Sequence, residues 1–489
     1  MVRRPALGLP FGSPSFSVLL LSLACGSGSG TGPDPAVTSV TVSPTPVTLV
    51  VGGSWPLVAR DQAGRPLTGP GVSWTTGAPA VATVSTAGMV LGVGDGPVTI
   101  TATVQGKTGS TAVTVVSLSL ASVAAGGAHT CALTTNGAAF CWGRNEVGQL
   151  GVASPPASCT IDAVVFPCSV FPVAVQGGLT FTVLDAGGTH TCGLTGTGSA
   201  YCWGRNNAGQ LGDNSATNRS APVAVAGGLT FTHLSVDALH SCGLIADGTA
   251  YCWGANSAGQ LGDGTTTNRS APVAVSGGLS FATITTGGYR FGLTCARTAA
   301  GVAYCWGENN TGQLGIGASD AVTHTTPEPV SGGIAFASLN AGPSHVCGLT
   351  AAGVAYCWGE NILGSLGDGS EIERPAPVAV AGGIAFAGIV PGGFSNLNAH
   401  TCGLTGTGQA HCWGDNEVGA IGDGTLVQRL APAAVTGQLS FASLQAGYRH
   451  SCGRTGAGIV YCWGSNRAGQ LGINSLALES EPTLVIGQQ

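Results

Sequence analysis

The stretch that decides the fold is residues 181–230, which read FTVLDAGGTHTCGLTGTGSAYCWGRNNAGQLGDNSATNRSAPVAVAGGLT. Four short runs in it are typical of β-strands: residues 181–184, 190–194, 200–204 and 222–225. Glycine-rich turns and one polar loop separate these runs. Four strands in about 50 residues are typical of one blade of a β-propeller.

The unit recurs seven times from residue 118 onward, and one tryptophan in each copy marks its register. These tryptophans are spaced by 50 to 61 residues: Trp142, Trp203, Trp253, Trp306, Trp358, Trp413 and Trp463. The repeat predicts an all-β fold in which residues 118–489 form a closed, seven-bladed β-propeller. The chain enters this array with a first-strand sequence and leaves with a last-strand sequence. If the structural blade is offset from the sequence unit, both chain ends share one blade and lock the ring, which removes open strand edges.

Cysteine is the most informative residue type, with 17 copies. Two residues ten positions apart, with a turn such as Asn136-Gly137 at their midpoint, lie opposite each other on adjacent strands, within disulfide range. A metal site built from His-x-Cys plus Cys is the alternative, but it offers three ligands per unit and the fourth unit has Leu293 in place of the histidine. We therefore predict disulfides between Cys131 and Cys141, Cys192 and Cys202, Cys242 and Cys252, Cys295 and Cys305, Cys347 and Cys357, Cys402 and Cys412, Cys452 and Cys462, and, in a loop insertion, Cys159 and Cys168.

Charge and cysteine usage restrict the partners and the compartment. The formal net charge is −6, charged residues make up 8% of the chain, and Lys107 is its one lysine. Such a chain has no basic surface for a phosphate backbone, so nucleic-acid binding is disfavoured. Paired cysteines in a long chain indicate an oxidising compartment.

The N-terminus predicts export. Arg3 and Arg4 precede a short apolar core that ends at Cys25, and this core is too short to span a bilayer as a mature helix. Residues 1–25 resemble a bacterial lipoprotein signal, which implies lipidation of Cys25. Ser22 departs from the leucine that is usual there, and an ordinary secretory signal is the alternative. The glycine- and serine-rich residues 26–35 are typical of a flexible tether.

Residues 36–116 have a different texture, with short β-branched runs between turn clusters. This pattern predicts a small β-sandwich. Residues 40–44, 49–52, 72–74, 82–85, 88–90 and 100–102 carry a resemblance to bacterial Ig-like domains of group 2. The resemblance implies that Trp74 is the core tryptophan and that the domain serves as a spacer or as an adhesive module.

The repeats resemble the regulator of chromosome condensation family of propellers. The motifs that carry the resemblance are G-G-x-H-[TS]-C-x-L, Y-C-W-G-x-N and G-Q-L-G-[DN]-G. Eukaryotic members imply guanine-nucleotide exchange, which acts on a cytosolic GTPase and conflicts with export. Secreted bacterial relatives of the β-lactamase inhibitory protein II type imply inhibition of a protein. The first, fourth and sixth units depart most from the pattern.

Residues that recur in nearly every unit are more simply explained by structure than by chemistry. We expect the histidines to hydrogen-bond a turn, the Trp-Gly indoles to fill the space between blades, and Asn206 and Asp213, with their equivalents, to form turns. One carboxylate per loop is too few for calcium. No catalytic residue, cofactor site or metal site is predicted, and the chain is not expected to be an enzyme. The repeated histidines are His129, His190, His240, His345, His400 and His450.

Function is then expected where the units differ, in loops on a propeller face. Aromatic and arginine side chains are favoured anchors in binding sites, so we predict a ligand face that includes Tyr289, Arg290, Phe291 and Phe394. The sequence thus predicts a monomeric, extracytoplasmic binding or scaffold protein, anchored by lipid or secreted, with a protein or an envelope glycan as partner. An exchange-factor-like regulator and an enzyme acting on envelope polymers are the alternatives.

Overall fold

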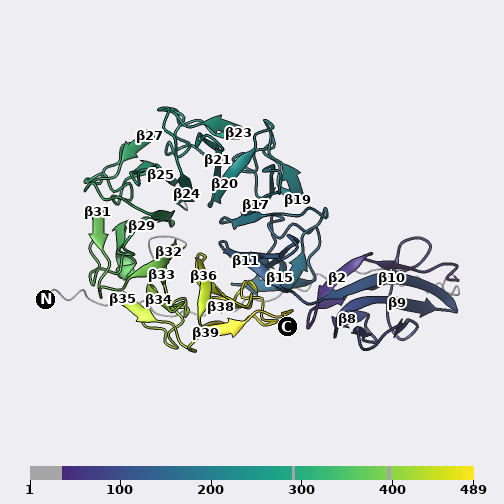
Figure 1. Ribbon diagram of the computed structural model, residues 1–489. Coiled ribbons are helices and arrows are strands. Elements are labelled where there is room, and N and C mark those ends of the chain that lie inside the picture. Colours follow the sequence, from purple (N-terminus) through teal and green to yellow (C-terminus); the bar gives the residue numbers. More distant parts are fainter. Residues whose placement is uncertain (1–35, 289–291, 394–397, 489) are drawn as a thin grey trace, which may run out of the picture.

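The computed structural model describes residues 36–288, 292–393 and 398–488. Seven antiparallel sheets form a ring, and a small β-sandwich lies beside the ring where the chain enters it (Figure 1). The described part is all-β apart from one short 3-10 turn, η1 (Ile362–Gly364). None of its helices has the length and apolar character needed to cross a membrane.

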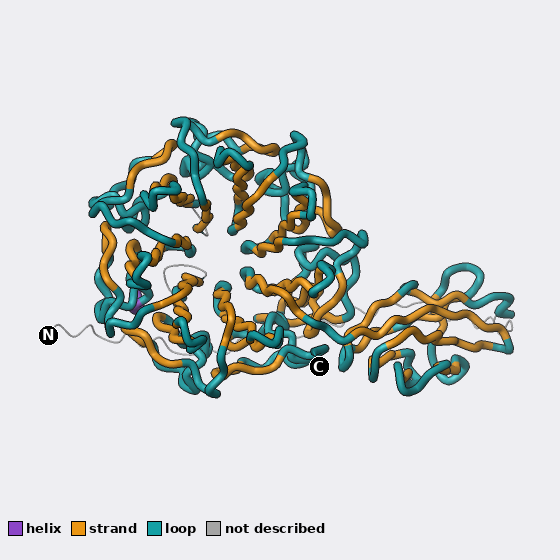
Figure 2. The backbone as a smooth tube through the Cα atoms, viewed as in Figure 1, coloured by secondary structure: helices purple, strands orange, loops and turns teal. Residues whose placement is uncertain are grey.

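In blades 2 to 7 the four strands follow one another from the centre of the ring to its rim, whereas in blade 1 the extra strand β14 lies at the edge, beyond β15 (Figure 1 and Figure 2). Blades 1 to 3 contain β11 (Leu120–Ala125), β12 (His129–Thr134), β13 (Ala139–Arg144), β14 (Ala157–Ile161) and β15 (Val164–Ala174); β16 (Val183–Ala186), β17 (His190–Leu194), β18 (Ala200–Gly204) and β19 (Arg219–Ala224); and β20 (Phe231–Val236), β21 (His240–Ile245), β22 (Ala250–Gly254) and β23 (Arg269–Ala274). Blades 4 and 5 contain β24 (Thr283–Gly287), β25 (Leu293–Arg297), β26 (Ala303–Gly307) and β27 (His324–Pro329); and β28 (Ser338–Ala341), β29 (His345–Leu349), β30 (Ala355–Gly359) and β31 (Arg374–Ala379). Blades 6 and 7 contain β32 (Phe386–Gly392), β33 (His400–Thr405), β34 (Ala410–Gly414) and β35 (Arg429–Ala434); and β36 (Phe441–Ala446), β37 (His450–Thr455), β38 (Val460–Gly464) and β39 (Glu479–Leu484).

The Trp-Gly pair explains the shape of the third and fourth strands. In blade 2 the register of β18 and β19 shifts between Cys202 and Gly204, so that Trp203 stands at an irregularity in the ladder. Gly204 has a φ of 104°, and a Cβ there would lie 2.7 Å from the carbonyl oxygen of Thr189. Only glycine fits this conformation and this close approach, which accounts for its place after every repeated tryptophan.

The hydrophobic core lies between blades. One cluster combines Cys192, Leu194 and Leu211 of blade 2 with Phe231 and Trp253 of blade 3. All seven repeated tryptophans are fully buried, as expected for side chains that fill the space between neighbouring sheets. A blade therefore cannot bury its apolar face alone, and the ring is the unit that folds.

Blade order follows sequence order, so the expected sharing of one blade by the two chain ends is wrong. The first strand of the array, β11, is the innermost strand of blade 1, and the last strand, β39, is the outermost strand of blade 7. Closure instead uses contacts between complete blades: Tyr448 N donates to Gly126 O (3.2 Å) and Asn474 N donates to Val170 O (2.8 Å). The repeat begins in phase with the structural blade, so no offset strand is available to be shared.

The sandwich has three small sheets, ordered β1-β4-β5, β2-β10-β9-β6 and β3-β8-β7. Trp74 is only half-buried, because it lies on β6 at the edge of its sheet, and its ring covers Gly88. Trp74 packs against the hydrophobic core of the sandwich, as the resemblance implies, but it is only partly buried. The strands are β1 (Thr41–Ser43), β2 (Val47–Val50), β3 (Ser54–Pro56), β4 (Val58–Arg60), β5 (Pro66–Leu67), β6 (Ser73–Thr76), β7 (Ala82–Val84), β8 (Met89–Gly92), β9 (Gly96–Val104) and β10 (Lys107–Val116).

The sandwich packs directly on the propeller. A single hydrophobic cluster includes Val50 of the sandwich, Phe171 of blade 1 and Val485 at the end of the chain. Leu118 N donates to the carbonyl of Gly487, which ties the linker between the two parts to the C-terminal segment. The sandwich therefore packs against the first blade and the C-terminal segment in a defined position.

Candidate binding face

Two sets of loops emerge on the same face of the ring. Strands within a blade alternate in direction, so the loop between the first and second strands and the loop between the third and fourth strands lie at the same end of the blade. In blade 2 these loops touch: Arg205 N donates to Thr189 O (3.0 Å). We call this side the loop face.

The four predicted ligand residues lie outside the described residues: Tyr289, Arg290, Phe291 and Phe394. The described residues that flank them, Gly288, Gly292 and Gly393, belong to first loops of blades 4 and 6, and hence to the loop face. The first unit has additional residues at 152–171, which form the hairpin β14–β15 of blade 1, and additional residues at 318–326 enlarge the second loop of blade 4.

The repeated histidines join neighbouring blades instead of bonding a local turn. In each case Nε2 lies 2.7 to 2.9 Å from a hydroxyl on the second strand of the next blade. That hydroxyl belongs to the residue before the cysteine of the next unit. The pairs are His129–Thr191, His190–Ser241, His240–Thr294, His345–Thr401, His400–Ser451 and His450–Thr130.

The interface between blades 4 and 5 lacks this pair on both sides. Leu293 stands where the histidine would be, and Val346 stands where the hydroxyl would be. Both side chains are fully buried in one hydrophobic cluster. An apolar pair has therefore replaced a polar pair as a unit.

The hydrogen-bond network fixes the state of the histidines. The Thr191 hydroxyl donates to Gln149 O (3.0 Å), so it must accept from His129, whose Nε2 then carries the proton. Nδ1 of His129 is buried and has no partner, so a second proton would be a buried, unsolvated charge. Burial accordingly lowers the pKa of His129 to about 3 and that of His400 to about 4. The histidines are neutral structural groups, and they are unsuited to acid–base catalysis at neutral pH.

Five of the seven repeated tryptophans, all but Trp253 and Trp358, donate to the same carbonyls that receive the hydroxyls. Trp203 Nε1 donates to Gln149 O (3.0 Å), and Trp142 Nε1 donates to Gln470 O (2.8 Å) across the junction of blades 1 and 7. These indoles thus link blades as well as filling the space between them.

The asparagines and aspartates organise the second loop, as predicted, and an arginine joins them. Asn206 Oδ1 accepts from Leu211 N (2.9 Å), and its Nδ2 donates to Asp213 Oδ1 (2.9 Å). Asp213 also pairs with Arg219 at 2.8 Å. Burial raises the pKa of Asp213, but hydrogen bonds from Ser215 and Arg219 outweigh it, so the net pKa is lowered. The same ion pair recurs as Asp263–Arg269, Asp368–Arg374 and Asp423–Arg429.

Blade 4 replaces this arginine with a histidine. His324 pairs with the third strand at the position that Arg219 occupies in blade 2. Its Nδ1 lies 2.6 Å from Glu328 and its Nε2 lies 3.0 Å from Asp320. Burial lowers the pKa of His324, but the two carboxylates outweigh it, so the net pKa is raised.

The cysteines are bonded in the predicted pairs. In the hairpins the two cysteines are direct cross-strand partners, with Cα atoms 4.0 or 4.1 Å apart. Cys159 and Cys168 close the extra hairpin of blade 1. Their sulfurs are therefore unavailable as metal ligands, which removes the alternative reading of the repeated His-x-Cys.

Side-chain hydrogen bonds, which we call inner clasps, also join the first strands of neighbouring blades from blade 2 to blade 6. Asp185 accepts from Val236 N (2.8 Å), Ser235 accepts from Thr286 N (3.0 Å), and Thr285 accepts from Ala341 N (3.0 Å). Asn340 Nδ2 continues the series by donating to Ile389 O (3.0 Å). Each clasp joins one blade to the next.

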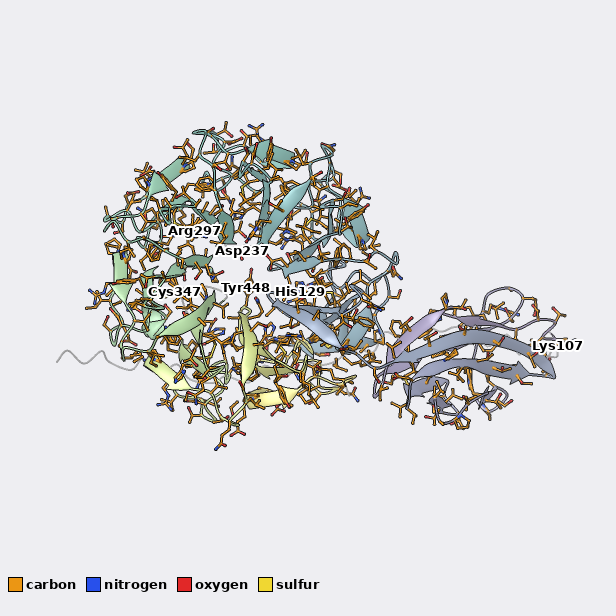
Figure 3. All side chains as sticks on the ribbon, in the orientation of Figure 1. Lys107, His129, Asp237, Arg297, Cys347 and Tyr448 are labelled. Atoms are coloured by element: carbon orange, nitrogen blue, oxygen red, sulfur yellow. A yellow bond between two sulfur atoms is a disulfide. The ribbon has the colours of Figure 1, made fainter. Side chains whose placement is uncertain are left out.

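A pocket of about 140 Å³ opens at the centre of the ring, lined by first strands and first loops. Tyr448 points into the middle of the ring (Figure 3). Two acids line the pocket: burial raises the pKa of Asp185 to about 6, and burial with the nearby Asp185 raises that of Asp237 to about 7. Within residues 36–288, 292–393 and 398–488, no three His, Cys, Asp or Glu side chains come together as a metal site.

The sequence analysis did not predict three kinds of contact: the His–hydroxyl bonds, the Asp–Arg pairs and the inner clasps. The His–hydroxyl bonds could have been recognised in the sequence. A Thr or Ser precedes the first cysteine of every pair except Cys347, which lies in the unit directly after the one that lacks the histidine. The Asp–Arg pair also recurs at a constant spacing of six residues. Neither signal reveals by itself which blade supplies the partner.

Comparison with known proteins agrees with this geometry. The profile described as the regulator of chromosome condensation (RCC1) repeat matches residues 136–194, 197–244, 247–290, 300–349 and 457–489. A second profile of the same repeat matches residues 120–149, 181–210, 398–420 and 441–470. Together they cover more than half of the chain. The chain belongs to the RCC1-repeat family.

The bacterial Ig-like domain (group 2) profile matches residues 36–115. Such a domain, together with many disulfides, is consistent with a place outside the cytoplasm. An RCC1-repeat propeller is mainly a fold for protein interaction and regulation.

Curated relatives match about two thirds of this chain. The human E3 ubiquitin-protein ligase HERC2 is 27% identical over 319 residues, which are 64% of this chain and 5% of that protein. The ultraviolet-B receptor UVR8 of Arabidopsis thaliana is 27% identical over 330 residues, which are 64% of this chain and 57% of the receptor. The chain therefore spans less than two thirds of the length of either relative.

Solved structures show the same fold at low identity. Human WBSCR16 superposes with a TM-score of 0.58 and 21% identity, covering 68% of this chain and 86% of that one. Yeast RCC1 (Prp20), solved bound to Kap60, superposes with a TM-score of 0.59 and 20% identity, covering 71% and 83%. These likenesses establish the propeller fold.

Proposed function

We propose that this chain is an extracytoplasmic binding protein whose propeller holds a protein partner on its loop face. One observation carries the proposal. The polar groups that recur in the blades are buried and engaged with neighbouring blades or with their own loops, as His129 and Asn206 illustrate. The described insertions that distinguish blades 1 and 4, residues 152–171 and 318–326, lie between the third and fourth strands and hence on the loop face, where a rigid scaffold commonly carries recognition.

The Ig-like domain and the disulfides support a position outside the cytoplasm, with export by residues 1–25 and lipidation at Cys25 as part of the proposal. An envelope glycan is the second class of ligand that such a face could hold. The proposal does not include the activities for which HERC2 and UVR8 are named.

The test is capture from an envelope extract by the immobilised, oxidised full chain, with reduced and alkylated chain as control. We expect the oxidised chain to retain a partner that disappears when the extract is treated with proteinase beforehand. Retention of material that resists proteinase but is removed by glycan hydrolysis would contradict a protein partner. Equal retention by both forms of the chain would contradict a folded binding face.

A further inference from the structure

Exposed aliphatic side chains gather on the rim of the loop face in blades 4 to 7. The residue two positions before the outermost strand is Thr217 in blade 2 and Thr267 in blade 3, but Val322, Ile372 and Val427 in blades 4, 5 and 6. In blade 7 two leucines flank the same position. We call the following set the apolar crescent, with exposed fractions of 42 to 64%: Val322, Ile372, Leu426, Val427, Leu476 and Leu478.

The crescent side chains stand on a fixed backbone. Ile372 N donates to Ser370 Oγ (3.3 Å), and Ile372 O accepts from the buried Asn361 (3.1 Å). Val427 has the same two bonds, from its N to Thr425 Oγ1 (3.3 Å) and to its O from Asn416 (3.2 Å). A partner would therefore not have to order these loops on binding, which lowers the entropic cost of association.

The loops also touch one another along the rim. Gln428 Nε2 of blade 6 donates to Glu371 Oε1 of blade 5 (2.8 Å). Beneath them, Gly369 N of blade 5 donates to Leu430 O of blade 6, and Gly424 N of blade 6 donates to Ser480 O of blade 7. The second loops of blades 5, 6 and 7 thus adjoin one another along the rim. Exposed aliphatic side chains on adjoining loops indicate an interaction site more strongly than a single scattered side chain does.

The charge beside the crescent is negative. Glu371 and Glu373 flank Ile372, and both are exposed. In blades 5 and 6 the arginines of these loops are engaged, since Arg374 pairs with Asp368 and Arg429 pairs with Asp423. The acids also extend inward from the rim: burial, with Glu373 nearby, raises the pKa of Glu360.

We propose that the apolar crescent and its flanking carboxylates bind a polypeptide segment in which aliphatic side chains stand beside lysine or arginine. This rests on the proposed function and specifies its face and its partner. Like charge disfavours a second copy of the chain as the occupant. The crescent is purely aliphatic and has acids at its border, whereas lipid-binding surfaces carry aromatic and basic residues.

The first test measures binding of fluorescein-labelled 12-residue peptides to the full chain by fluorescence polarisation. One peptide contains leucine and lysine, and its counterpart has glutamate in place of lysine. We expect the lysine peptide alone to bind, and I372T/V427T to weaken it about tenfold. Threonine occupies the same backbone position in blades 2 and 3, so this variant should fold, and T217S/T267S is the matched control. Equal affinity of I372T/V427T and T217S/T267S for the lysine peptide, or equal affinity of the native chain for both peptides, would overturn the proposal.

Charge is tested with E371Q/E373Q. This variant should bind the lysine peptide less tightly and show a shallower dependence of affinity on salt concentration. An unchanged salt dependence would overturn the part assigned to the carboxylates.

Repeating the envelope capture with I372T/V427T separates this inference from the proposed function. Loss of the captured protein supports the crescent. Full retention by the variant overturns the crescent and leaves the binding function standing, whereas no capture by the native chain overturns both. Two results would assign the crescent to another occupant and overturn the proposal: vesicles of phosphatidylglycerol and phosphatidylethanolamine that bind the native chain but not the variant, or a dimer in light scattering that the variant loses.

Discussion

The interface between blades 4 and 5 and the other six blade interfaces solve one packing problem in two ways. Six interfaces bury a histidine opposite a hydroxyl, as in His129–Thr191. The interface between blades 4 and 5 instead buries Leu293 with Val346. All these side chains are fully buried. The polar pair is therefore not required for one blade to pack against the next. What the fold requires is that both members be polar and bonded or both be apolar, because a buried donor without an acceptor is costly.

The largest difference between the two kinds of interface should appear in acid. Each buried histidine has its pKa lowered, to about 3 for His129, so the unfolded chain takes up a proton first as the pH falls below about 6.5. The free energy of unfolding that each neutral, buried histidine contributes is fully present above pH 6.5 and is lost as the pH falls toward 3. At pH 5 the loss is about 2 kcal/mol per histidine. Urea unfolding from pH 7 to pH 4.5 should show H129L/T191V losing less stability than the native chain, and identical slopes would contradict this account.

Placing a histidine alone in the apolar interface should be the most damaging single change. L293H removes apolar packing and buries an imidazole opposite Val346, where no hydroxyl can accept its proton. We expect a loss of about 3 kcal/mol in the free energy of unfolding. The double variant L293H/V346T, which copies the other six interfaces, should recover at least half of the loss. Failure of V346T to rescue L293H in urea unfolding would show that the two positions do not act as a pair.

The reverse experiment should have a smaller effect. T191V leaves the His129 Nε2–H without its acceptor, at a cost of about 1–2 kcal/mol. H129L/T191V, which copies the Leu293–Val346 pair, should cost less than T191V alone. The coupling energy from this double-mutant cycle, measured by urea unfolding, should be favourable to the native pair. A coupling energy of zero would mean that the His–hydroxyl bond has no net value.

The smallest effect concerns the loops, where blade 4 again differs from blades 2, 3, 5 and 6. The pKa of His324 is raised in the folded chain, so its contribution is fully present below the unfolded pKa and is lost as the pH rises through the folded pKa. H324R keeps its charge in this range and should be more stable than the native chain by roughly 0.5 kcal/mol at pH 9. Thermal unfolding at pH 6 and pH 9 checks this. An advantage of H324R that is the same at both values would rule out titration of His324 as the cause.

The sequence predicted the repeated unit well because its signals are local. Cys131 and Cys141 flank one hairpin, and their spacing alone makes them cross-strand partners. The same reasoning gave the loop role of Asn206. It failed for the histidines, which were assigned to turns, because their hydroxyl partners lie in the next unit. It also failed for the chain ends, since the phase between sequence unit and structural blade cannot be read from the repeat.

The amino-acid sequence by itself determined that the chain forms an all-β ring of seven repeats with covalently closed hairpins, because strand length, turn and cysteine spacing act within about 50 residues. Only the tertiary structure decided which blade each buried polar group meets, how the two ends join, and which loop residues share a rim. These contacts join residues far apart in the chain, such as Thr130 and His450 with a separation of 320. Such pairs depend on the curvature of the closed ring, which no local pattern encodes.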